Sequence, residues 1–293
     1  MTDNSATSPS SLRRPRLKAP PGACDTHIHL YGPYDRYPLA PGRFYDPDQD
    51  APLESYLETL DRLGLERAVI VTGGGNGTDN RVTLDAIAAM KGRFKGVALI
   101  EPTISDKDLT ALARGGITGF RTRANGKGAL NFADARRIAP RVKDFGWHVE
   151  FHVQTLDDAL DAIPHLKALR LPFVLDHLAH LGPEIAPDDP RLRRLLDVFK
   201  GEENCWINLY SFYQRSHSGL PDYRDMIPVV ETLVAARPDR LMWGTNWPHV
   251  FIKVPKPDDA DLLDFMLAAV PDETVRTAIL SGNPARLYGW SKP

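Results

Sequence analysis

Short apolar runs alternate along the chain with longer segments in which apolar residues recur every three or four positions. The short runs predict buried strands, and the longer segments predict amphipathic helices. Eight strands are expected, at residues 23–29, 68–72, 96–100, 119–122, 148–153, 173–177, 206–210 and 241–245. These runs are apolar nearly throughout rather than alternating with polar residues. Such a pattern is typical of parallel strands that are covered on both faces.

Helices are expected between the strands, and several carry a clear end signal. The segment at residues 53–64, for example, places leucines on one face and ends at Gly64. A strand–helix unit repeated roughly eight times in a chain of 293 residues predicts a single (β/α)8 barrel. An open, doubly wound sheet is the rival, but no strand is followed by the G-x-G-x-x-G turn of that fold. We expect the barrel to span residues 22–293, after a flexible arm at residues 1–21 that is rich in Ser, Pro and Arg.

Composition narrows the classes of function. Lys and Arg number 36 against 38 Asp and Glu, so the net charge of -2 gives no bulk reason to expect nucleic acid or an anionic membrane as a partner. No apolar run approaches the roughly 20 residues that a membrane span needs, and the first residues lack the apolar core of a secretory signal. Cys24 and Cys205 adjoin apolar runs and are expected to be buried free thiols. These features predict a cytoplasmic protein whose partner is a small molecule, with its oligomeric state left open.

Polar side chains gather where the predicted strands end. In a (β/α)8 barrel the carboxyl ends of the strands carry the active site, and residues two apart on one strand point to the same side. His27 and His29 form such a pair on the first strand, and Arg121 and Arg123 form another on the fourth. A buried guanidinium needs an anion. The sequence shows no evident carboxylate partner for Arg121, so we expect it to bind a carboxylate of the ligand. Five further residues stand at or just past the ends of other strands: His152, His177, His180, Asn246 and His249.

Other candidate positions have simpler interpretations. His148 begins a strand and is expected to be structural, whereas His165 and His217 are expected to face solvent. The glycine run at residues 72–80 lacks the Gly-Lys-Ser/Thr ending of a P-loop, so we interpret it as a flexible loop that lets a ligand approach the backbone. Burying several imidazoles without a function would waste hydrogen-bonding capacity. The convergence of histidines at the strand ends therefore favours an active site there.

Four stretches together carry a resemblance to a known family. They are DTHIH at residues 25–29, LDH at 175–177, WGTNWPH at 243–249 and NPARLYGW at 283–290. In this order they resemble the amidohydrolase superfamily. More narrowly, they resemble its lactone-acting branch, which includes the 2-pyrone-4,6-dicarboxylate lactonases, the sugar lactonases and the D-galactarolactone isomerases. The resemblance covers nearly the whole chain, from about residue 22 to residue 290, and implies a (β/α)8 barrel with its active site at the mouth.

The resemblance also implies roles for individual residues. His27, His29 and His177 match the imidazoles that polarise the lactone carbonyl, in a reaction that requires no metal. Asn246 is the fourth catalytic position, because it stands where the pyrone dicarboxylate lactonases have an aspartate that activates water. Eight residues match or neighbour substrate-binding positions: Tyr45, Gly74, Arg121, Arg123, Lys127, His152, His180 and His249. Three of these depart from the lactonase pattern, which argues against the planar pyrone dicarboxylate as substrate: Gly74, His152 and His180.

The amide at position 246 leaves the reaction open. A carboxylate there could take a proton from water, whereas an amide cannot do so at neutral pH. Three explanations remain: hydrolysis with an imidazole as the base, movement of the lactone linkage between substrate hydroxyls, or an engineered replacement of an aspartate. We expect an enzyme that acts on the ester bond of an anionic, carboxylated lactone. Hydrolysis is the first expectation, and isomerisation, which Asn246 favours, is the alternative.

Two other classes of function are carried as alternatives. The first is a metal-dependent amidohydrolase, in which His27, His29, His152 and His177 would bind a divalent metal such as zinc without help from a carboxylate at position 246. The second is a sugar-acid-binding protein that does not turn its ligand over. The enzyme that we expect first uses no cofactor.

Overall fold

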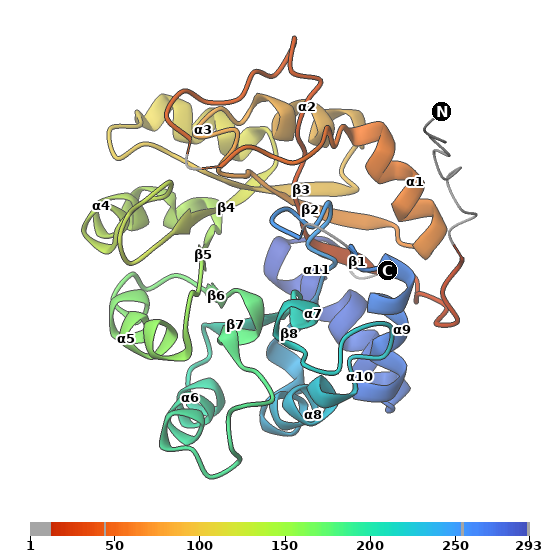
Figure 1. Cartoon of the computed structure of the whole chain (residues 1–293). Helices are drawn as coiled ribbons and strands as arrows, with labels where there is room; N and C mark the ends of the chain where they lie inside the picture. Colours follow the sequence, from red (N-terminus) through yellow and green to blue (C-terminus); the bar gives the residue numbers. More distant parts are fainter. Residues whose placement is uncertain (1–12, 44, 253–254, 292–293) are drawn as a thin grey trace, which may run out of the picture.

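The chain folds into eight parallel strands around a common axis, with helices on the outside (Figure 1). The computed structural model describes residues 13–43, 45–252 and 255–291. The (β/α)8 barrel that the sequence predicts is confirmed, as a single domain. The strands pair in sequence order: β1 (Cys24–Ile28), β2 (Arg67–Val71), β3 (Phe94–Ala98), β4 (Ile117–Thr122), β5 (His148–Phe151), β6 (Phe173–Leu175), β7 (Cys205–Leu209) and β8 (Leu241–Trp243).

Strand β8 is shorter than the sequence pattern predicts, because the chain turns toward β1 directly after Trp243. A Cβ atom on Gly244 would lie 2.9 Å from the backbone nitrogen of His27, so only glycine permits this close approach. The buried carboxylate of Asp25 accepts hydrogen bonds from the backbone nitrogen and the hydroxyl of Thr245, at 2.9 and 2.6 Å. These contacts tie the end of β8 to the strand that carries the H-x-H pair.

Hydrogen bonds just past the end of β8 close the barrel. The backbone nitrogen of Asn246 donates to the carbonyl oxygen of His27 at 2.9 Å, and that of His29 donates to the carbonyl oxygen of Trp247 at 2.8 Å. The loop after β8 therefore continues the ladder of the sheet against β1. This pairing fixes the position of the loop's side chains along the barrel axis.

Eleven α-helices lie among the described residues, most of them on the outside of the barrel (Figure 1). Several begin at the caps that their sequences provide: the Ser105 hydroxyl accepts from the Asp108 backbone nitrogen at 3.1 Å, and α1 ends at Gly64 with a φ of 71°. The bounds are α1 (Leu53–Leu63), α2 (Arg81–Ala89), α3 (Asp106–Arg114), α4 (Phe132–Val142), α5 (Leu156–Lys167), α6 (Pro190–Gly201), α7 (Phe212–Arg215), α8 (Ile227–Ala236), α9 (Asp259–Ala269), α10 (Glu273–Thr277) and α11 (Asn283–Tyr288).

The barrel interior changes from apolar to polar along its axis. Alternate residues of each strand point inward, and on β6 and just past it these are Val174 and then Asp176. Val174 belongs to an apolar cluster of strand residues that Tyr288 of α11 completes. Asp176 and Glu150, on the neighbouring strand, are instead fully buried carboxylic acids near the carboxyl ends of the strands. Buried ionisable groups therefore lie directly beneath the mouth of the barrel.

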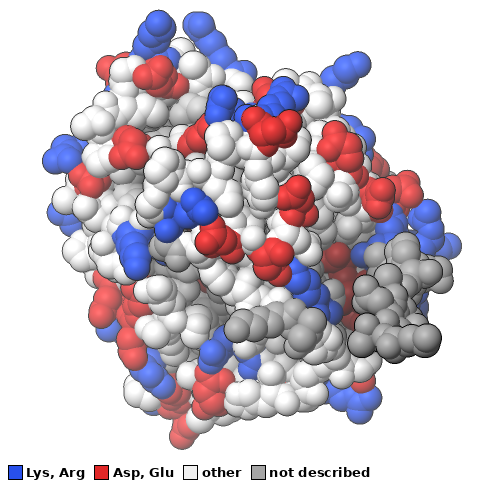
Figure 2. Space-filling model, turned by 45° about the horizontal axis from the view of Figure 1, so that its top comes forward, with Lys and Arg blue, Asp and Glu red and all other residues white. Residues whose placement is uncertain are grey.

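The stretch before β1 runs along α9. The guanidinium of Arg13 pairs with Asp264 at 2.7 Å, and the backbone nitrogen of Leu17 donates to the same carboxylate at 2.8 Å. Residues 1–12 of the predicted arm lie outside the described residues. Positive and negative side chains are interspersed over the face shown in Figure 2. Within the described ranges, no helix combines the length and the apolar character that a bilayer crossing requires.

Candidate active site

A cavity of about 560 Å³ opens at the carboxyl ends of the strands. It is of the size that takes a small ligand. Its wall contains ten of the twelve residues that the sequence singles out: His29, Tyr45, Gly74, Arg121, Arg123, Lys127, His152, His177, His180 and Asn246. The other two, His27 and His249, lie behind the wall and contact residues that line it, His29 and Asn246 respectively. The barrel thus brings the predicted residues to one place, although not all of them reach the cavity.

His27 lies beneath His29 and is fully buried. The Nδ1 of His29 is 2.7 Å from the carbonyl oxygen of Val71, which can only accept, so this nitrogen carries the proton. The Nε2 of His29 then accepts from the Nε2 of His27 at 3.3 Å. The His27 ring stacks on Tyr210 with a centroid separation of 4.1 Å. Both nitrogens of His29 are therefore engaged within the protein, and His27 supports its position from below.

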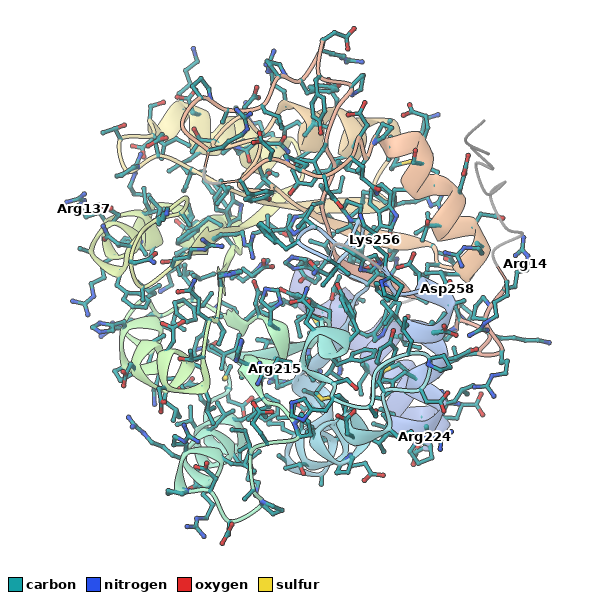
Figure 3. The ribbon with its side chains drawn as sticks, in the orientation of Figure 1. Arg14, Arg137, Arg215, Arg224, Lys256 and Asp258 are labelled. Atoms are coloured by element: carbon teal, nitrogen blue, oxygen red, sulfur yellow. The ribbon has the colours of Figure 1, made fainter. Side chains whose placement is uncertain are left out.

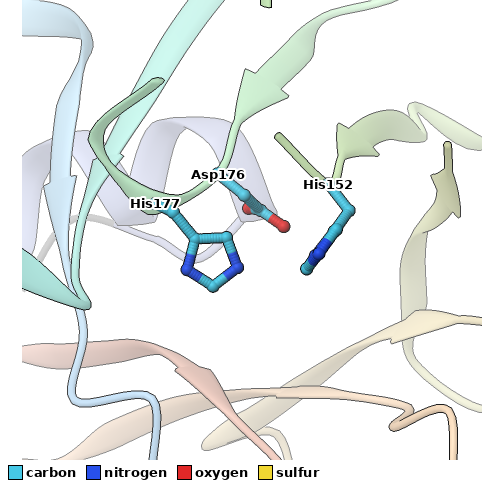
Figure 4. A group of neighbouring side chains, drawn as sticks. All are labelled: His152, Asp176 and His177. Atoms are coloured by element: carbon cyan, nitrogen blue, oxygen red, sulfur yellow. The ribbon is translucent and has the colours of Figure 1, made fainter. Parts of the chain in front are cut away.

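His152 and His177 have more direct access to the cavity. The chain enters the left-handed region at His177, with a φ of 52°, which turns the side chain toward the barrel axis. The two rings are 5.0 Å apart at nearly right angles, and the carboxylate of Asp176 lies between them in the view of Figure 4. Arg121 donates to the Nδ1 of His152 at 3.3 Å, so the proton of the neutral ring sits on Nε2. His152 can therefore donate a hydrogen bond to a ligand.

Arg121 is held by two carboxyl groups of the chain itself. Its Nε is 3.1 Å from Glu150 and its Nη2 is 2.9 Å from Asp176, and all three side chains are buried. The expectation that Arg121 has no carboxylate partner within the chain is therefore wrong. Burial and the neighbouring Asp176 raise the pKa of Glu150 well above its ordinary value. Arg121 still lines the cavity, but its charge is already balanced by the protein.

Glu150 and Asp176 were not among the residues singled out from the sequence. The signal was present, because Glu150 interrupts an apolar strand and Asp176 directly precedes His177. A charged residue inside a buried strand needs a partner. Its pairing with Arg121 depends on the register of β4 against β5, in which Arg121 stands opposite Glu150.

The imidazoles around the cavity are neutral at neutral pH. Burial, reinforced by the positive charge of Arg121, lowers the pKa of His29 to about 3. Burial likewise lowers the pKa of His177 and of His152 well below the ordinary value of 6.5. The pKa of His180 is also lowered, mainly by burial. A neutral imidazole can donate from one nitrogen and accept a proton at the other.

Asn246 projects from the loop after β8 with a φ of 64°. Its amide nitrogen donates to the hydroxyl of Ser211 at 3.0 Å and to that of Tyr213 at 3.2 Å. Both hydrogens of the amide are thereby used, which leaves the carbonyl oxygen for the cavity that Asn246 lines. Ser211 and Tyr213 were not predicted to belong to the site. Their signal is the polar stretch SFYQR that follows β7.

Cationic side chains stand on two sides of the cavity. Arg123 and Lys127 come from the loop after β4, and the Arg123 Nη1 donates to the Lys127 carbonyl oxygen at 3.2 Å. Burial and the nearby Arg121 lower the pKa of Arg123 to about 10. Arg215, which was also not predicted, comes from α7 and pairs with Glu184. It lies over the middle of the barrel, whereas Arg137 lies at the rim (Figure 3). This distribution suits a ligand that carries negative charge.

The fold and the cavity together define a barrel enzyme of the amidohydrolase type. The chain belongs to the amidohydrolase family, whose model matches residues 24–290. It is 35% identical over 280 residues to the 4-sulfomuconolactone hydrolase of Hydrogenophaga intermedia, covering 94% of this chain and 91% of the relative. It is 32% identical to the 2-pyrone-4,6-dicarboxylate hydrolase of Comamonas testosteroni, covering 94% and 92%. It is 31% identical to the D-galactarolactone isomerase of Agrobacterium fabrum, covering 94% and 93%.

A solved structure gives the same result. An apo crystal structure from Agrobacterium tumefaciens superposes with a TM-score of 0.84 at 31% sequence identity, covering 95% of this chain and all of the other. Similarity over nearly the whole length of these relatives places the barrel of this chain within one family architecture.

Two clusters of side chains bring potential metal-ligating atoms together near the mouth of the barrel. His152, Asp176 and His177 form one cluster of potential ligands, and His27, Glu150 and Asp176 form another. The guanidinium of Arg121 contacts both carboxyl groups, so a cation already occupies this position. Asn246, just after β8, offers a neutral amide rather than a carboxylate. Among the described residues, the guanidinium of Arg121 therefore competes with a divalent ion for both carboxyl groups. A zinc-bound amidohydrolase from Burkholderia multivorans, at 20% identity and a TM-score of 0.65, shares the fold.

Proposed function

We propose that this protein acts on the ester bond of an anionic, carboxylated lactone and that its principal reaction is ring opening by water. One observation carries the proposal: a single cavity joins neutral imidazoles to cationic side chains on two of its sides. The imidazoles suit chemistry at a carbonyl carbon, and the cations suit a carboxylate substituent. The names of the related proteins, two lactone hydrolases and a lactone isomerase, support the same class of substrate.

The geometry favours a division of labour among the histidines. In the described part of the chain, the imidazole of His177 makes no hydrogen bond to the protein, so its neutral ring is free to take a proton from the attacking water. His152, protonated on Nε2, donates to the oxygen that becomes negative in the tetrahedral intermediate. Water adds to the carbonyl carbon, the ring C–O bond breaks, and the proton held by His177 passes to the leaving alkoxide. The products are a carboxylic acid and a free hydroxyl on one open chain.

The remaining residues bind and orient the substrate. Arg123, Lys127 and Arg215 bind carboxylate groups from either side of the cavity. Asn246 accepts a hydrogen bond through its carbonyl oxygen, from the attacking water or from a substrate hydroxyl. Tyr45, whose hydroxyl is 2.5 Å from that of Tyr31, closes the side of the cavity near β2.

A second reaction, isomerisation of the lactone, is favoured by one observation, the amide at position 246. An amide holds a hydroxyl without taking its proton. If that hydroxyl belongs to the substrate and lies beside the carbonyl, the ester linkage moves from one oxygen to another and no water is consumed. The 31% identity to a D-galactarolactone isomerase supports this alternative.

We also propose that the reaction needs no metal ion, because Arg121 already balances the carboxyl groups that a metal would use. A cytoplasmic location is part of the proposal. The described cysteines, Cys24 and Cys205, are buried free thiols, which suits a reducing compartment.

A panel of lactones followed by NMR tests the proposal. The panel holds 4-sulfomuconolactone, 2-pyrone-4,6-dicarboxylate, D-galactarolactone and an uncharged lactone, each with enzyme that has been dialysed against a chelator. We expect at least one anionic lactone to be converted far faster than the uncharged one, with full activity after chelation. Equal rates on charged and uncharged lactones would contradict the anionic substrate. Activity that is lost on chelation and restored by a stoichiometric divalent ion would contradict metal independence.

A further inference from the structure

The amide of Asn246 is the last member of a hydrogen-bond chain that begins on α9. Asp259 accepts from the Nε2 of His249 at 2.9 Å, the Nδ1 of His249 is 2.9 Å from the hydroxyl of Tyr213, and that hydroxyl is 3.2 Å from the amide nitrogen of Asn246. Asp259, His249 and Asn246 are buried, with exposed fractions of 5%, 3% and 4%. The members come from the loop after β8, from α9 and from α7, so the chain joins three separate elements.

For a His249 ring that carries a single proton, the direction of every bond in this chain follows from its first member. Asp259 is paired with Arg62 at 3.3 Å through its other oxygen, so its carboxylate accepts from His249. The Nε2 of His249 therefore carries the proton, and its Nδ1 accepts from the hydroxyl of Tyr213. The oxygen of Tyr213 can then accept from the Asn246 amide. Each residue thus determines whether the next one donates or accepts a hydrogen bond.

This direction fixes how Asn246 faces the cavity. One hydrogen of its amide nitrogen is given to Tyr213 and the other to Ser211 at 3.0 Å. A rotated amide would place its carbonyl oxygen against two oxygen atoms, one of which has no hydrogen to give. The carbonyl oxygen is therefore the atom that remains for the cavity.

We propose that Tyr213 and His249 are positioning residues that hold Asn246 with its oxygen toward the cavity, so that residue 246 serves only as a hydrogen-bond acceptor. The proposal rests on the proposed function, because it assigns a role within that active site. Asn246 then receives the O–H of the nucleophile, whether water or a substrate hydroxyl. It gives no hydrogen bond to the oxyanion, which is left to the imidazoles. This hydrogen-bond chain requires a donor at position 246. An amide supplies one, whereas a carboxylate would have no hydrogen to give to Tyr213.

The protonation state of His249 tests the chain without any substrate. Long-range ¹⁵N–¹H correlation spectra report which ring nitrogen carries a proton, and the His249→Gln variant identifies the signals. In the parent protein we expect the proton on Nε2 and none on Nδ1, as the contacts with Asp259 and Tyr213 require. In Asn246→Asp, the Tyr213 hydroxyl turns toward the new carboxylate, so Nδ1 of His249 loses its hydrogen-bond donor and its ¹⁵N signal should shift. A ring protonated on Nδ1 in the parent protein, or an unchanged ring in Asn246→Asp, would overturn the proposal.

A double-mutant cycle tests whether Tyr213 acts through Asn246. The substrate is the panel lactone that the parent protein converts fastest. Tyr213→Phe keeps the ring and removes the hydroxyl, and we expect it to lower kcat/KM by about 10-fold, the effect of one lost hydrogen bond. In an Asn246→Ala background the same change should have almost no further effect. Equal losses in the two backgrounds would show that the Tyr213 hydroxyl does not work through the amide and would overturn the proposal.

Tyr223→Phe is the matched control. The ring of Tyr223 lies beside α7, with its centroid 5.4 Å from that of Phe212. Its buried hydroxyl has no hydrogen-bond partner in the described structure. Its removal should leave kcat/KM unchanged. The two failures are distinguishable: if no lactone is converted, the proposed function fails, whereas the spectra of His249 still decide whether the chain exists.

Discussion

Arg121 carries a charge that the protein itself balances, and this decides which residues can bind the substrate's carboxylate. Arg123→Met should lower kcat/KM for a carboxylated lactone by roughly 10- to 100-fold, because a charge-assisted hydrogen bond is worth about 1.5–3 kcal/mol. The uncharged lactone should be affected far less. Steady-state kinetics on both substrates measure the difference. Equal losses on the two lactones would show that Arg123 is structural.

Arg121→Met is the contrasting variant. It leaves Glu150 and Asp176 buried without their cation, and breaking a buried pair in this way costs about 3–5 kcal/mol. We therefore expect a large loss of stability in chemical denaturation, with charged and uncharged lactones affected alike. A stable Arg121→Met protein with a selective defect on carboxylated lactones would restore Arg121 as the substrate anchor.

We assign the role of general base to His177. His177→Gln should lower kcat by about 10²–10⁴-fold, the usual contribution of a positioned general base. The exposed His217→Gln is the control and should have no effect.

The pH profile of the parent enzyme gives an independent check on the base. Since burial lowers the pKa of His177 well below 6.5, the base stays unprotonated as the solution is acidified through that value. The activity, measured as kcat/KM, should therefore remain level through pH 6.5 and fall only in more acidic solution. A profile with its midpoint at 6.5 would contradict a buried imidazole as the base.

At the scale of elements, the loop after β2 sets the shape of one cavity wall. A Cβ atom on Gly73 would lie 2.1 Å from the hydroxyl of Tyr31, which is itself 2.5 Å from the hydroxyl of Tyr45. Gly73→Ala should push this pair of tyrosines into the cavity, raising KM for the preferred lactone by at least about 10-fold, because a one-ångström displacement in a site can cost that much or more. Gly282→Ala, which has open space around the new methyl group, is the control. Unchanged KM in Gly73→Ala would show that Tyr45 does not face the substrate.

The elements also show how far sequence reasoning reaches. The H-x-H spacing and the strand-end positions place His29, His152 and His177 correctly at one mouth, because parallel strands bring their carboxyl ends together. The partners of Arg121 could not be read from spacing. They depend on a register between β4 and β5 that local sequence does not encode. The link from Asn246 to Asp259 depends on tertiary packing, because Tyr213 joins it from a separate helix.

At the scale of the whole molecule, the buried histidines should make the fold sensitive to acid. Burial lowers the pKa of His148 to about 4, against about 6.5 in an unfolded chain. Between these values the unfolded state binds more protons, so stability falls as the pH falls. For this one residue the loss from about pH 7.5 to about pH 5 is about 2 kcal/mol.

His148→Leu removes the imidazole that binds this extra proton in the unfolded state. Its free energy of unfolding should decline less steeply with acid than that of the parent protein, by about one proton over the same range. Urea denaturation at a series of pH values measures the slope. Parallel curves for the parent and the variant would show that His148 binds protons equally in the folded and unfolded states.

The central claim, attack of water on the ester carbonyl of a carboxylated lactone, is tested most directly by isotopic labelling. The lactone that the panel identifies is converted in H₂¹⁸O, and the product is analysed by mass spectrometry beside an enzyme-free control. We expect one heavy oxygen in the newly formed carboxylate of the open-chain product, at the enzymatic rate and in the presence of a chelator. An unlabelled isomeric lactone as the sole product would contradict it, because the nucleophile would then be a hydroxyl of the substrate.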